Sequence, residues 1–239
     1  MTVGELSGPW LAGRAHLKPK TLTGYESLLR TRVLPRWGDV ELTRLAHAEV
    51  VAWLAQMRSE GLSASRTRQA YHLMTSMLDD AVKDNRLSRN PAAGVSLPRL
   101  PKTERRYLTH GQVAALADAA SDYRLLVCVL AYTGLRWGEV AALRARRVDL
   151  FRGRLEIAEA VVDVGGAMVF GTPKSHQHRS MPVPRFLRDD LAEHLAGKGP
   201  DDLVFTAPRG AVLRVQNFRR RVSTPRRPAL GSRAWSRMN

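Results

Sequence analysis

The chain of 239 residues has the length of one large domain or two ordinary ones, and its 44% hydrophobic content excludes wholesale disorder. No apolar run approaches the ~20 residues that cross a bilayer, and Met1 to Trp10 lacks the pattern of a signal peptide, so we expect no membrane partner. The formal charge of +16 favours nucleic acid as a partner, although 32 of the 38 basic residues are arginine, a bias that a GC-rich genome alone can produce.

The single cysteine, Cys128, excludes an intrachain disulfide and fits a reducing cytoplasm. It lies in an apolar run, and we interpret it as a small buried hydrophobic residue. The charge is unevenly spread, because residues 214–239 hold eight arginines and no acidic residue.

Residues 1–90 predict a helical domain that begins with an amphipathic helix capped by Thr21 and ended by Pro35 and Gly38. Two further amphipathic stretches follow, and the short connections between them are typical of an antiparallel bundle. The apolar positions of the first helix are Leu22, Tyr25, Leu28, Leu29 and Val33.

The second stretch follows Thr43 and stops at Gly61, and the third opens at Ser63 and closes at Asn90-Pro91. Their inward positions are predicted to be Leu45, Val50, Val51, Trp53, Leu54 and Met57, and then Tyr71, Leu73, Met74, Met77, Leu78 and Val82. Residues 91–106, with Pro98 and Pro101, read as a linker with little to bury.

Residues 107–221 predict a second, mixed domain. Thr109 begins a helix, residues 123–132 form a buried central helix that Gly134 ends, and a short helix runs to Leu143. The later predicted elements are a strand over 155–162, a hairpin turn at Gly165-Gly166 into 167–170, a strand over 179–184, a helix over 185–196, a strand over 203–206 and a helix over 213–221. Residues 222–239 lack an amphipathic period, and we expect a disordered basic tail there.

Thr133-Gly134-Leu135-Arg136, with Glu139 three residues later, lies at the junction of two of these helices. An arginine that follows a glycine turn at a helix start can grip a phosphate with two parallel hydrogen bonds. Taken alone, Arg136 is better explained as an ordinary surface arginine after a loop.

The surrounding pattern resembles the first active-site segment of the tyrosine recombinase (phage integrase) family: a buried helix, T-G-L-R-x-x-E, and a step into a strand. The resemblance covers about residues 3–221. It implies a helical core-binding domain followed by an α+β catalytic domain, with Arg136 on the scissile phosphate and Glu139 supporting the site from behind. It also implies DNA cutting and joining in the integration of a phage or mobile element.

Thr172-Pro173-Lys174, a polar turn, and then Arg179 to Pro184 resemble the hairpin of the same family, T-P-K followed by R-x-x-P-L/V-P. By this match Lys174 donates a proton to the leaving 5′ oxygen, work that suits a flexible ammonium group. A hairpin lysine without that context is usually only solvated.

The first domain resembles the family's core-binding domain, so double-stranded DNA is the expected partner, with a homo-oligomer on DNA as a further possibility. The candidate phosphate contacts are Lys18, Lys20, Arg66, Arg68, Arg105 and Arg106. His176 and His178 at i and i+2, with no nearby Cys or acid pair, make a weak metal signal, so we expect no metal and no cofactor.

The sequence departs from the family after Thr206, because the H-x-L-R-H segment and the nucleophilic tyrosine do not occur. The five tyrosines, Tyr25, Tyr71, Tyr107, Tyr123 and Tyr132, all precede Arg136. We therefore interpret the chain as a C-terminally truncated or frameshifted relative that does not recombine DNA alone. The alternatives are a non-catalytic DNA-binding remnant or attachment-site occluder, and an arginine-rich helical protein without a nucleic-acid role. Loss of the family's terminal helices also predicts exposed apolar surface around residues 125–143.

Overall fold

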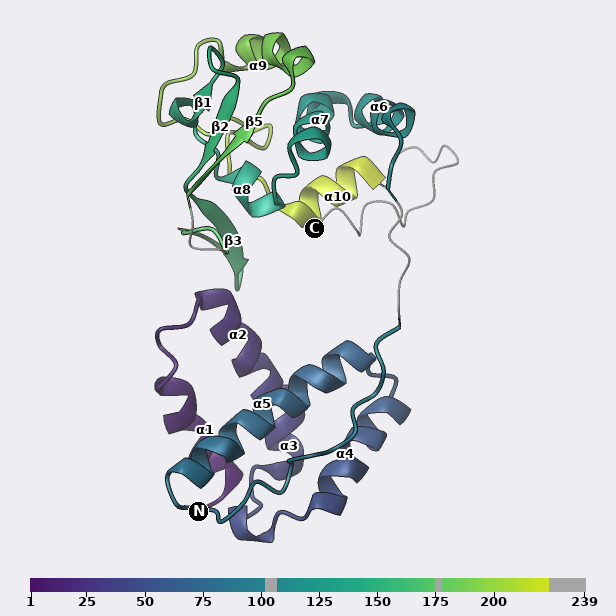
Figure 1. The fold of residues 1–239 in the computed structure, drawn as a ribbon, viewed down its shortest axis with the longest axis vertical. Coiled ribbons are helices and arrows are strands. Elements are labelled where there is room, and N and C mark those ends of the chain that lie inside the picture. Colours follow the sequence, from purple (N-terminus) through teal and green to yellow (C-terminus); the bar gives the residue numbers. More distant parts are fainter. Residues whose placement is uncertain (102–106, 175–177, 224–239) are drawn as a thin grey trace. The chain divides into compact units, whose positions relative to one another are not determined.

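The structure is a computed structural model that describes residues 1–101, 107–174 and 178–223. The chain divides into two compact units, Met1–Glu104 and Arg105–Asn239, whose elements are drawn in Figure 1. Each unit has its own hydrophobic core. The predicted fold class, mainly helical with a small antiparallel β element, is confirmed. Within the described ranges, none of the helices combines the length and apolar character that a membrane span needs.

The first unit is a helical bundle in which the long helix α5 packs against α1, α2 and α4. Its helices are α1 (Val3–Ala12), α2 (Pro19–Leu28), α3 (Leu34–Trp37), α4 (His47–Ser59) and α5 (Ala64–Lys83). The core gathers large apolar side chains from all five helices, among them Trp10, Leu28, Trp37, Trp53 and Met74.

Helix α1 is not among the elements predicted from the sequence, although Thr2 and Glu5 form a capping box at its start. Glu5 N donates to Thr2 Oγ1 (3.2 Å), and Thr2 N donates to Glu5 Oε2 (2.7 Å). Pro9 lies inside the helix, where a proline removes one backbone hydrogen bond. The Thr2–Glu5 pair is the sequence signal for the start of this helix, but Pro9 argues against a helix there.

The predicted limits of the first amphipathic helix are wrong at Thr21 and at Pro35, whereas the helix does end at the predicted Gly38. It begins after Lys18 rather than Thr21, because Pro19 at the first position already has a helical φ. It also passes Pro35 through a π turn, Leu29–Val33, and continues as α3 to Gly38. The wider π turn lets the helix accommodate a proline, which lacks the N–H of a regular turn.

The next two helices follow their predictions more closely. Helix α5 starts after Ser63, whose Oγ accepts a hydrogen bond from Arg66 N (3.2 Å). Helix α4, however, begins at His47 because Thr43 belongs to a preceding 3-10 turn, and Val51 is 44% exposed instead of buried. Helix α5 ends at Lys83, before the predicted stop at Asn90-Pro91.

The segment after α5 folds back onto the first unit. Asn90 Oδ1 accepts a hydrogen bond from Ala92 N (2.8 Å), and Tyr71 Oη donates one to Ala92 O (2.6 Å). Ala92 and Val95 are buried in the core of the first unit. The prediction that residues 91–106 have little to bury is therefore wrong at these two positions, because the Asn90 turn directs them inward.

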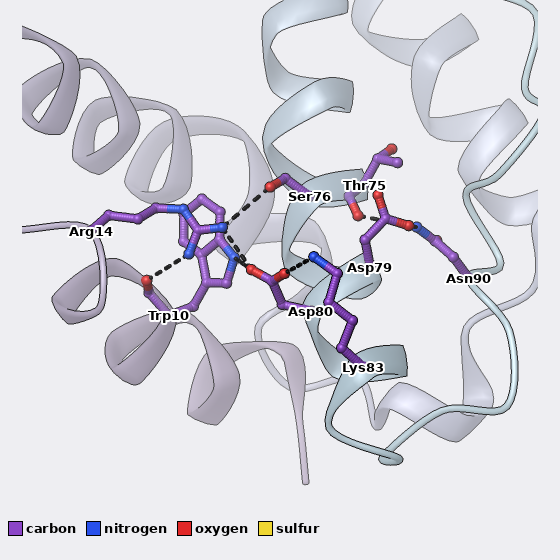
Figure 2. A network of polar contacts seen from close by, with 8 residues as sticks. All are labelled: Trp10, Arg14, Thr75, Ser76, Asp79, Asp80, Lys83 and Asn90. Atoms are coloured by element: carbon purple, nitrogen blue, oxygen red, sulfur yellow. Dashed lines mark hydrogen bonds and ion pairs between the residues drawn. The ribbon is translucent and has the colours of Figure 1, made fainter. Parts of the chain in front are cut away.

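A polar network ties α1 to α5 in the first unit (Figure 2). Asp80 accepts hydrogen bonds from Arg14 Nη2 (2.7 Å), Lys83 Nζ (2.8 Å) and Trp10 Nε1 (3.1 Å). The Arg14 guanidinium also lies over the Trp10 ring at 3.5 Å from its centroid. One carboxylate of α5 therefore holds the C-terminal end of α1 in place.

The second unit packs helices against two small antiparallel sheets. The helices are α6 (His110–Ala119), α7 (Arg124–Thr133), α8 (Trp137–Ala141), α9 (Arg188–Leu195) and α10 (Val215–Ser223). The strands are β1 (Val148–Asp149), β2 (Arg154–Ile157), β3 (Ala160–Val164), β4 (Ala167–Gly171) and β5 (Arg179–Pro182). Helix α6 begins at the predicted Thr109, which forms a capping box with Gln112.

The two sheets divide what the sequence predicts as one strand over 155–162. Strand β2 lies between β1 and β5, with Leu155 opposite Met181. Strand β3 pairs with β4 across the predicted Gly165-Gly166 turn, with Val162 opposite Val169. The predicted strand over 203–206 forms only isolated bridges, from Leu203 to Arg144 and from Thr206 to Val212.

Helix α10 packs across the elements that were expected to be exposed. The Phe218 ring lies 5.3 Å from that of Tyr123 and 4.8 Å from that of Trp137. None of the large hydrophobic side chains that the structure shows as exposed falls within residues 125–143. The predicted exposed patch is therefore wrong for the described residues, whose apolar side chains belong to the core of the second unit together with Phe218 of α10. The predicted tail lies mostly outside the described residues.

Candidate functional site

Arg136 is placed by the sharp junction between α7 and α8. Gly134 ends α7 in the left-handed conformation (φ 66°), and its N–H donates to Leu130 O (3.2 Å). Leu135 is then buried, which turns the next side chain outward. Arg136 occupies the N-cap of α8 with extended backbone, and its side chain is 56% exposed.

Glu139 lies behind Arg136, with only 2% of its side chain exposed. Its carboxylate accepts hydrogen bonds from Arg136 N (2.9 Å) and Arg136 Nη1 (3.0 Å). The first bond caps α8, and the second holds the guanidinium against the helix start. The structure thus brings together the two residues that the T-G-L-R-x-x-E motif pairs.

Arg179, the first residue of β5, completes this cluster and was not among the predicted site residues. Its Nη1 donates to Glu139 Oε1 (2.9 Å), and its Nη2 donates to Glu139 Oε2 (2.6 Å). This is the bidentate geometry in which guanidinium and carboxylate bind each other most strongly. The sequence signal that could have identified Arg179 as a site residue is its position as the arginine of the R-x-x-P pattern.

The charges of the cluster depend on these contacts. Burial acts to raise the pKa of Glu139, but hydrogen bonds from Arg179 and Arg136 outweigh it and hold that pKa below its usual value of 4.5. The same contact raises the pKa of Arg179. Glu139 and Arg179 are therefore ionised at neutral pH, and because a guanidinium keeps its proton in proteins, the cluster with Arg136 carries one net positive charge.

Gly138 allows α8 to approach the β3–β4 hairpin closely. A Cβ atom at this position would lie 2.6 Å from Val161 O, closer than real side chains come. Any larger residue would push α8 away from β3. The glycine therefore sets the depth at which Glu139 enters the core.

Lys174 is exposed on the turn that follows β4, as the hairpin match predicts. Among the described residues no hydrogen bond or ion pair joins it to Arg136, Glu139 or Arg179. The structure therefore places it on a neighbouring element of the same unit without bringing it into the cluster. Ser175, His176 and Gln177 lie outside the described residues.

The predicted DNA contacts of the first unit lie at helix starts. Lys18 is the N-cap of α2 and Lys20 lies in its first turn, while Arg66 and Arg68 lie near the start of α5. Arg66 Nη2 reaches Ser27 Oγ of α2 (3.4 Å), and Arg68 Nη1 donates to Pro98 O (3.4 Å). Arg66 therefore joins the start of α5 to the C-terminal end of α2, whereas Lys18 and Lys20 lie at the opposite end of α2. Arg105 and Arg106 lie outside the described residues.

Metal ligation finds little support in the described part of the chain. His178 is exposed and lines a shallow groove with Arg147, Glu156 and Arg179. The described residues include no cluster of three or more His, Cys, Asp or Glu side chains that would hold a metal ion. Cys128 is buried as predicted, and burial raises the pKa of its thiol.

Comparison with known sequences finds several relatives, while no family model matches the chain. The integrase of Mycobacterium phage D29 is 29% identical over 229 residues, which are 92% of this chain and 60% of the phage protein. The putative prophage phiRv2 integrase of Mycobacterium tuberculosis is 28% identical over 209 residues, 84% of this chain and 55% of that protein. The tyrosine recombinase XerC of Ralstonia pickettii is 29% identical over 220 residues, 82% of this chain and 66% of that protein.

Solved structures share the fold at lower identity. The Tn1549 transposon integrase, in complex with a circular intermediate DNA, superposes with a TM-score of 0.77 at 18% identity, over 89% of this chain and 74% of that one. A lambda integrase tetramer bound to a Holliday junction gives a TM-score of 0.71 at 17% identity, over 93% and 65% of the two chains.

The chain spans about 60% of the length of its phage D29 relative. Because the aligned stretch covers 92% of this chain, it reaches into both units and includes the Arg136 motif and the hairpin that bears Lys174. The sequence relatives are named integrase or tyrosine recombinase, and the solved integrase structures share the fold. Together these likenesses in sequence and fold support the resemblance of this chain to the tyrosine recombinase family.

Proposed function

We propose that the chain binds double-stranded DNA and presents a partial site for strand cleavage and joining in the integration of a phage or mobile element. In this proposal residues 1–90 act as the core-binding domain, residues 107–221 form the catalytic unit, and residues 91–106 connect them. The single observation that carries it is the Arg136–Glu139 pair. It is a solvent-facing guanidinium fixed from behind by a carboxylate that is 2% exposed.

The proposed chemistry divides between two elements of the second unit. Arg136 binds the scissile phosphate and stabilises the charge that develops on its oxygens. Lys174 protonates the leaving 5′ oxygen, a role that its exposed position on the turn after β4 permits. Glu139 does not touch the substrate in this scheme and instead orients Arg136.

The proposed site lacks a nucleophilic tyrosine, and four of the five tyrosines make contacts with other residues of the two units. Tyr71 Oη is bound to Ala92 O, and Tyr132 Oη lies 3.1 Å from His110 Nδ1. Tyr25 packs on Trp10, and Tyr123 packs on Phe218. We propose that these 239 residues do not cleave DNA by themselves. The alternative role is that of a non-catalytic DNA-binding remnant or an attachment-site occluder.

DNA binding is tested by fluorescence anisotropy with a labelled duplex over a range of salt concentrations. We expect the association constant to fall steeply as salt rises, and Arg136→Ala to reduce the slope of log K against log salt by about 0.9, the loss of one phosphate contact. Arg152→Ala is the matched control, because Arg152 is 77% exposed and bound to Asp149. Absence of binding at moderate salt would overturn the DNA-binding proposal.

Cleavage is tested with a nicked suicide substrate that carries the attachment sequence of the element. A cleaving recombinase becomes covalently trapped on such DNA, so we expect bound complex without a covalent adduct. An adduct that survives denaturing electrophoresis, and that Arg136→Ala abolishes, would show a complete active site. The chain would then be a functional recombinase, and the proposed lack of cleavage would be wrong.

A further inference from the structure

Glu139 is shared between two arginines that come from different elements. Arg136 approaches from the start of α8 and Arg179 from the start of β5. A carboxylate offers about four lone-pair sites to hydrogen-bond donors. Arg136 N, Arg136 Nη1, Arg179 Nη1 and Arg179 Nη2 supply four donors at 2.6–3.0 Å, so the acceptor capacity of Glu139 is filled.

The two arginines differ in what remains free for a substrate. Arg179 directs both of its terminal nitrogens at Glu139, and 28% of its side chain is exposed. Arg136 directs one terminal nitrogen at Glu139, and 56% of its side chain is exposed. Arg179 thus uses both terminal nitrogens to bind the Glu139 carboxylate, whereas Arg136 uses one and its side chain still faces solvent.

This division has an electrostatic consequence for Arg136. If Glu139 had Arg136 as its one cationic partner, the buried carboxylate would neutralise that guanidinium and draw it inward. With Arg179 present, the negative charge is already paired, and the cluster keeps one net positive charge at the exposed arginine. A phosphate that approaches Arg136 then meets a cation and not a neutral ion pair.

We propose that Arg179 is a positioning residue that neutralises Glu139, so that Arg136 keeps its charge and its orientation toward a DNA phosphate. This inference rests on the proposed phosphate-binding role of Arg136. Two other roles for Arg179 make different predictions. It could bind a phosphate directly, or it could only stabilise the fold.

The test compares variants of the full chain by the slope of log K against log salt for a labelled duplex, with melting temperature measured in parallel. The variants are Arg136→Ala, Arg179→Met, Glu139→Gln and the double variant Arg179→Met with Glu139→Gln. Arg179→Lys is added as a conservative variant that keeps the charge but loses the bidentate geometry. Arg152→Ala serves as the exposed-arginine control.

We expect Arg179→Met to lower the slope by about 0.9, as Arg136→Ala does, because the remaining carboxylate then neutralises Arg136. The double variant removes the charges of Arg179 and Glu139 together, so its slope returns to that of the unaltered chain. Arg179→Lys gives an intermediate slope. Adding Arg136→Ala to Arg179→Met causes no further loss, since both act on the same phosphate contact.

Three results would overturn the proposal, and each has its own signature. If Arg179 binds phosphate itself, its loss adds to that of Arg136, and Glu139→Gln restores nothing. If Arg179 only supports the fold, Arg179→Met lowers the melting temperature and leaves the slope unchanged. If Arg136→Ala itself leaves the slope unchanged, the phosphate-binding role of Arg136 fails, and the role of Arg179 fails with it.

Discussion

Each unit of the molecule contains one carboxylate that gathers basic side chains from separate elements, and the two differ mainly in burial. Asp80 of the first unit binds Arg14, Lys83 and Trp10, and its side chain is 33% exposed (Figure 2). Glu139 of the second unit binds Arg136 and Arg179 at 2% exposure. Water can replace a lost partner of Asp80, but it cannot do so at Glu139.

This difference in burial separates the two carboxylates in what the loss of a partner should cost. An exposed ion pair contributes little to folding, whereas a buried charge that loses its partner costs several kcal/mol. Asp80 therefore connects α1 to α5 without being indispensable. The stability of the second unit depends on both arginines that bind Glu139. Loss of Arg179 from β5 should therefore also affect the start of α8, where Arg136 binds the same carboxylate.

The largest effect is expected from Arg179→Met. It leaves Glu139 buried with one guanidinium, and we expect the second unit to lose about 3 kcal/mol of its free energy of unfolding. Urea unfolding, followed by hydrogen exchange of α8 and β5 amides, measures the loss. Arg152→Met, at a 77% exposed side chain, should leave the midpoint unchanged. A loss for Arg179→Met no larger than this control would remove the contrast between the two carboxylates.

The next effect concerns pH. Because the pKa of folded Glu139 is below its usual 4.5, the unfolded chain takes up a proton first as pH falls. The stabilisation is therefore complete above about 4.5 and is lost as pH falls through the folded pKa. Glu139→Gln should remove this acid-side loss from the second unit. Urea midpoints measured from neutral to acid pH test this.

Asp80→Asn is the matched comparison in the first unit. Hydrogen bonds from Arg14 and Lys83 lower the pKa of Asp80, so the sign of its pH dependence is the same. We expect a smaller change in acid sensitivity than for Glu139→Gln, because solvent screens the partly exposed Asp80. Equal changes in the two variants would show that burial does not distinguish the two sites.

A smaller effect is expected from Arg14→Met, which removes the contact with Asp80 and the cation that lies 3.5 Å from the Trp10 ring centroid. The loss should be about 1 kcal/mol and should be confined to α1, which loses its tie to α5. Faster hydrogen exchange of α1 amides, with α4 unchanged, is the expected observation. Equal acceleration in α4 would mean that the network supports the whole bundle.

The smallest effect is expected from Lys83→Met. Lys83 also contacts Asp80, and this contact raises its pKa, but its side chain is 74% exposed. We expect no measurable change in the urea midpoint of the first unit. A decrease as large as that of Arg14→Met would show that exposure does not predict the contribution of a partner in this network.

Local signals explain which parts of the fold could be predicted from the sequence. Thr109 caps α6, Gly134 ends α7, and Gly165-Gly166 turns the hairpin, since each acts through its own backbone or that of near neighbours. Arg136 and Glu139 were found because they are three residues apart on one turn.

Contacts between distant residues explain what could not be predicted. Arg179 lies 40 residues from Glu139, and only the pairing of β5 with β2 brings it there. Ala92 and Val95 looked like linker residues because nothing local shows that Asn90 turns them inward. The π turn before Pro35 likewise has no local sequence signature, and a proline normally indicates the end of a helix.

The Arg179–Glu139 contact also bears on the turn that carries Lys174. On one side that turn leaves the hairpin at Gly171, which pairs with Ala160, and on the other it enters β5 at Arg179. Arg179 therefore anchors one end of this turn to Glu139, in addition to supplying a positive charge. A shorter tether raises the effective concentration of an attached group near its target. Arg136 and Lys174, to which we assign phosphate binding and proton donation, would then be coupled, because Glu139 binds Arg136 directly and, through Arg179, holds one end of the turn that carries Lys174.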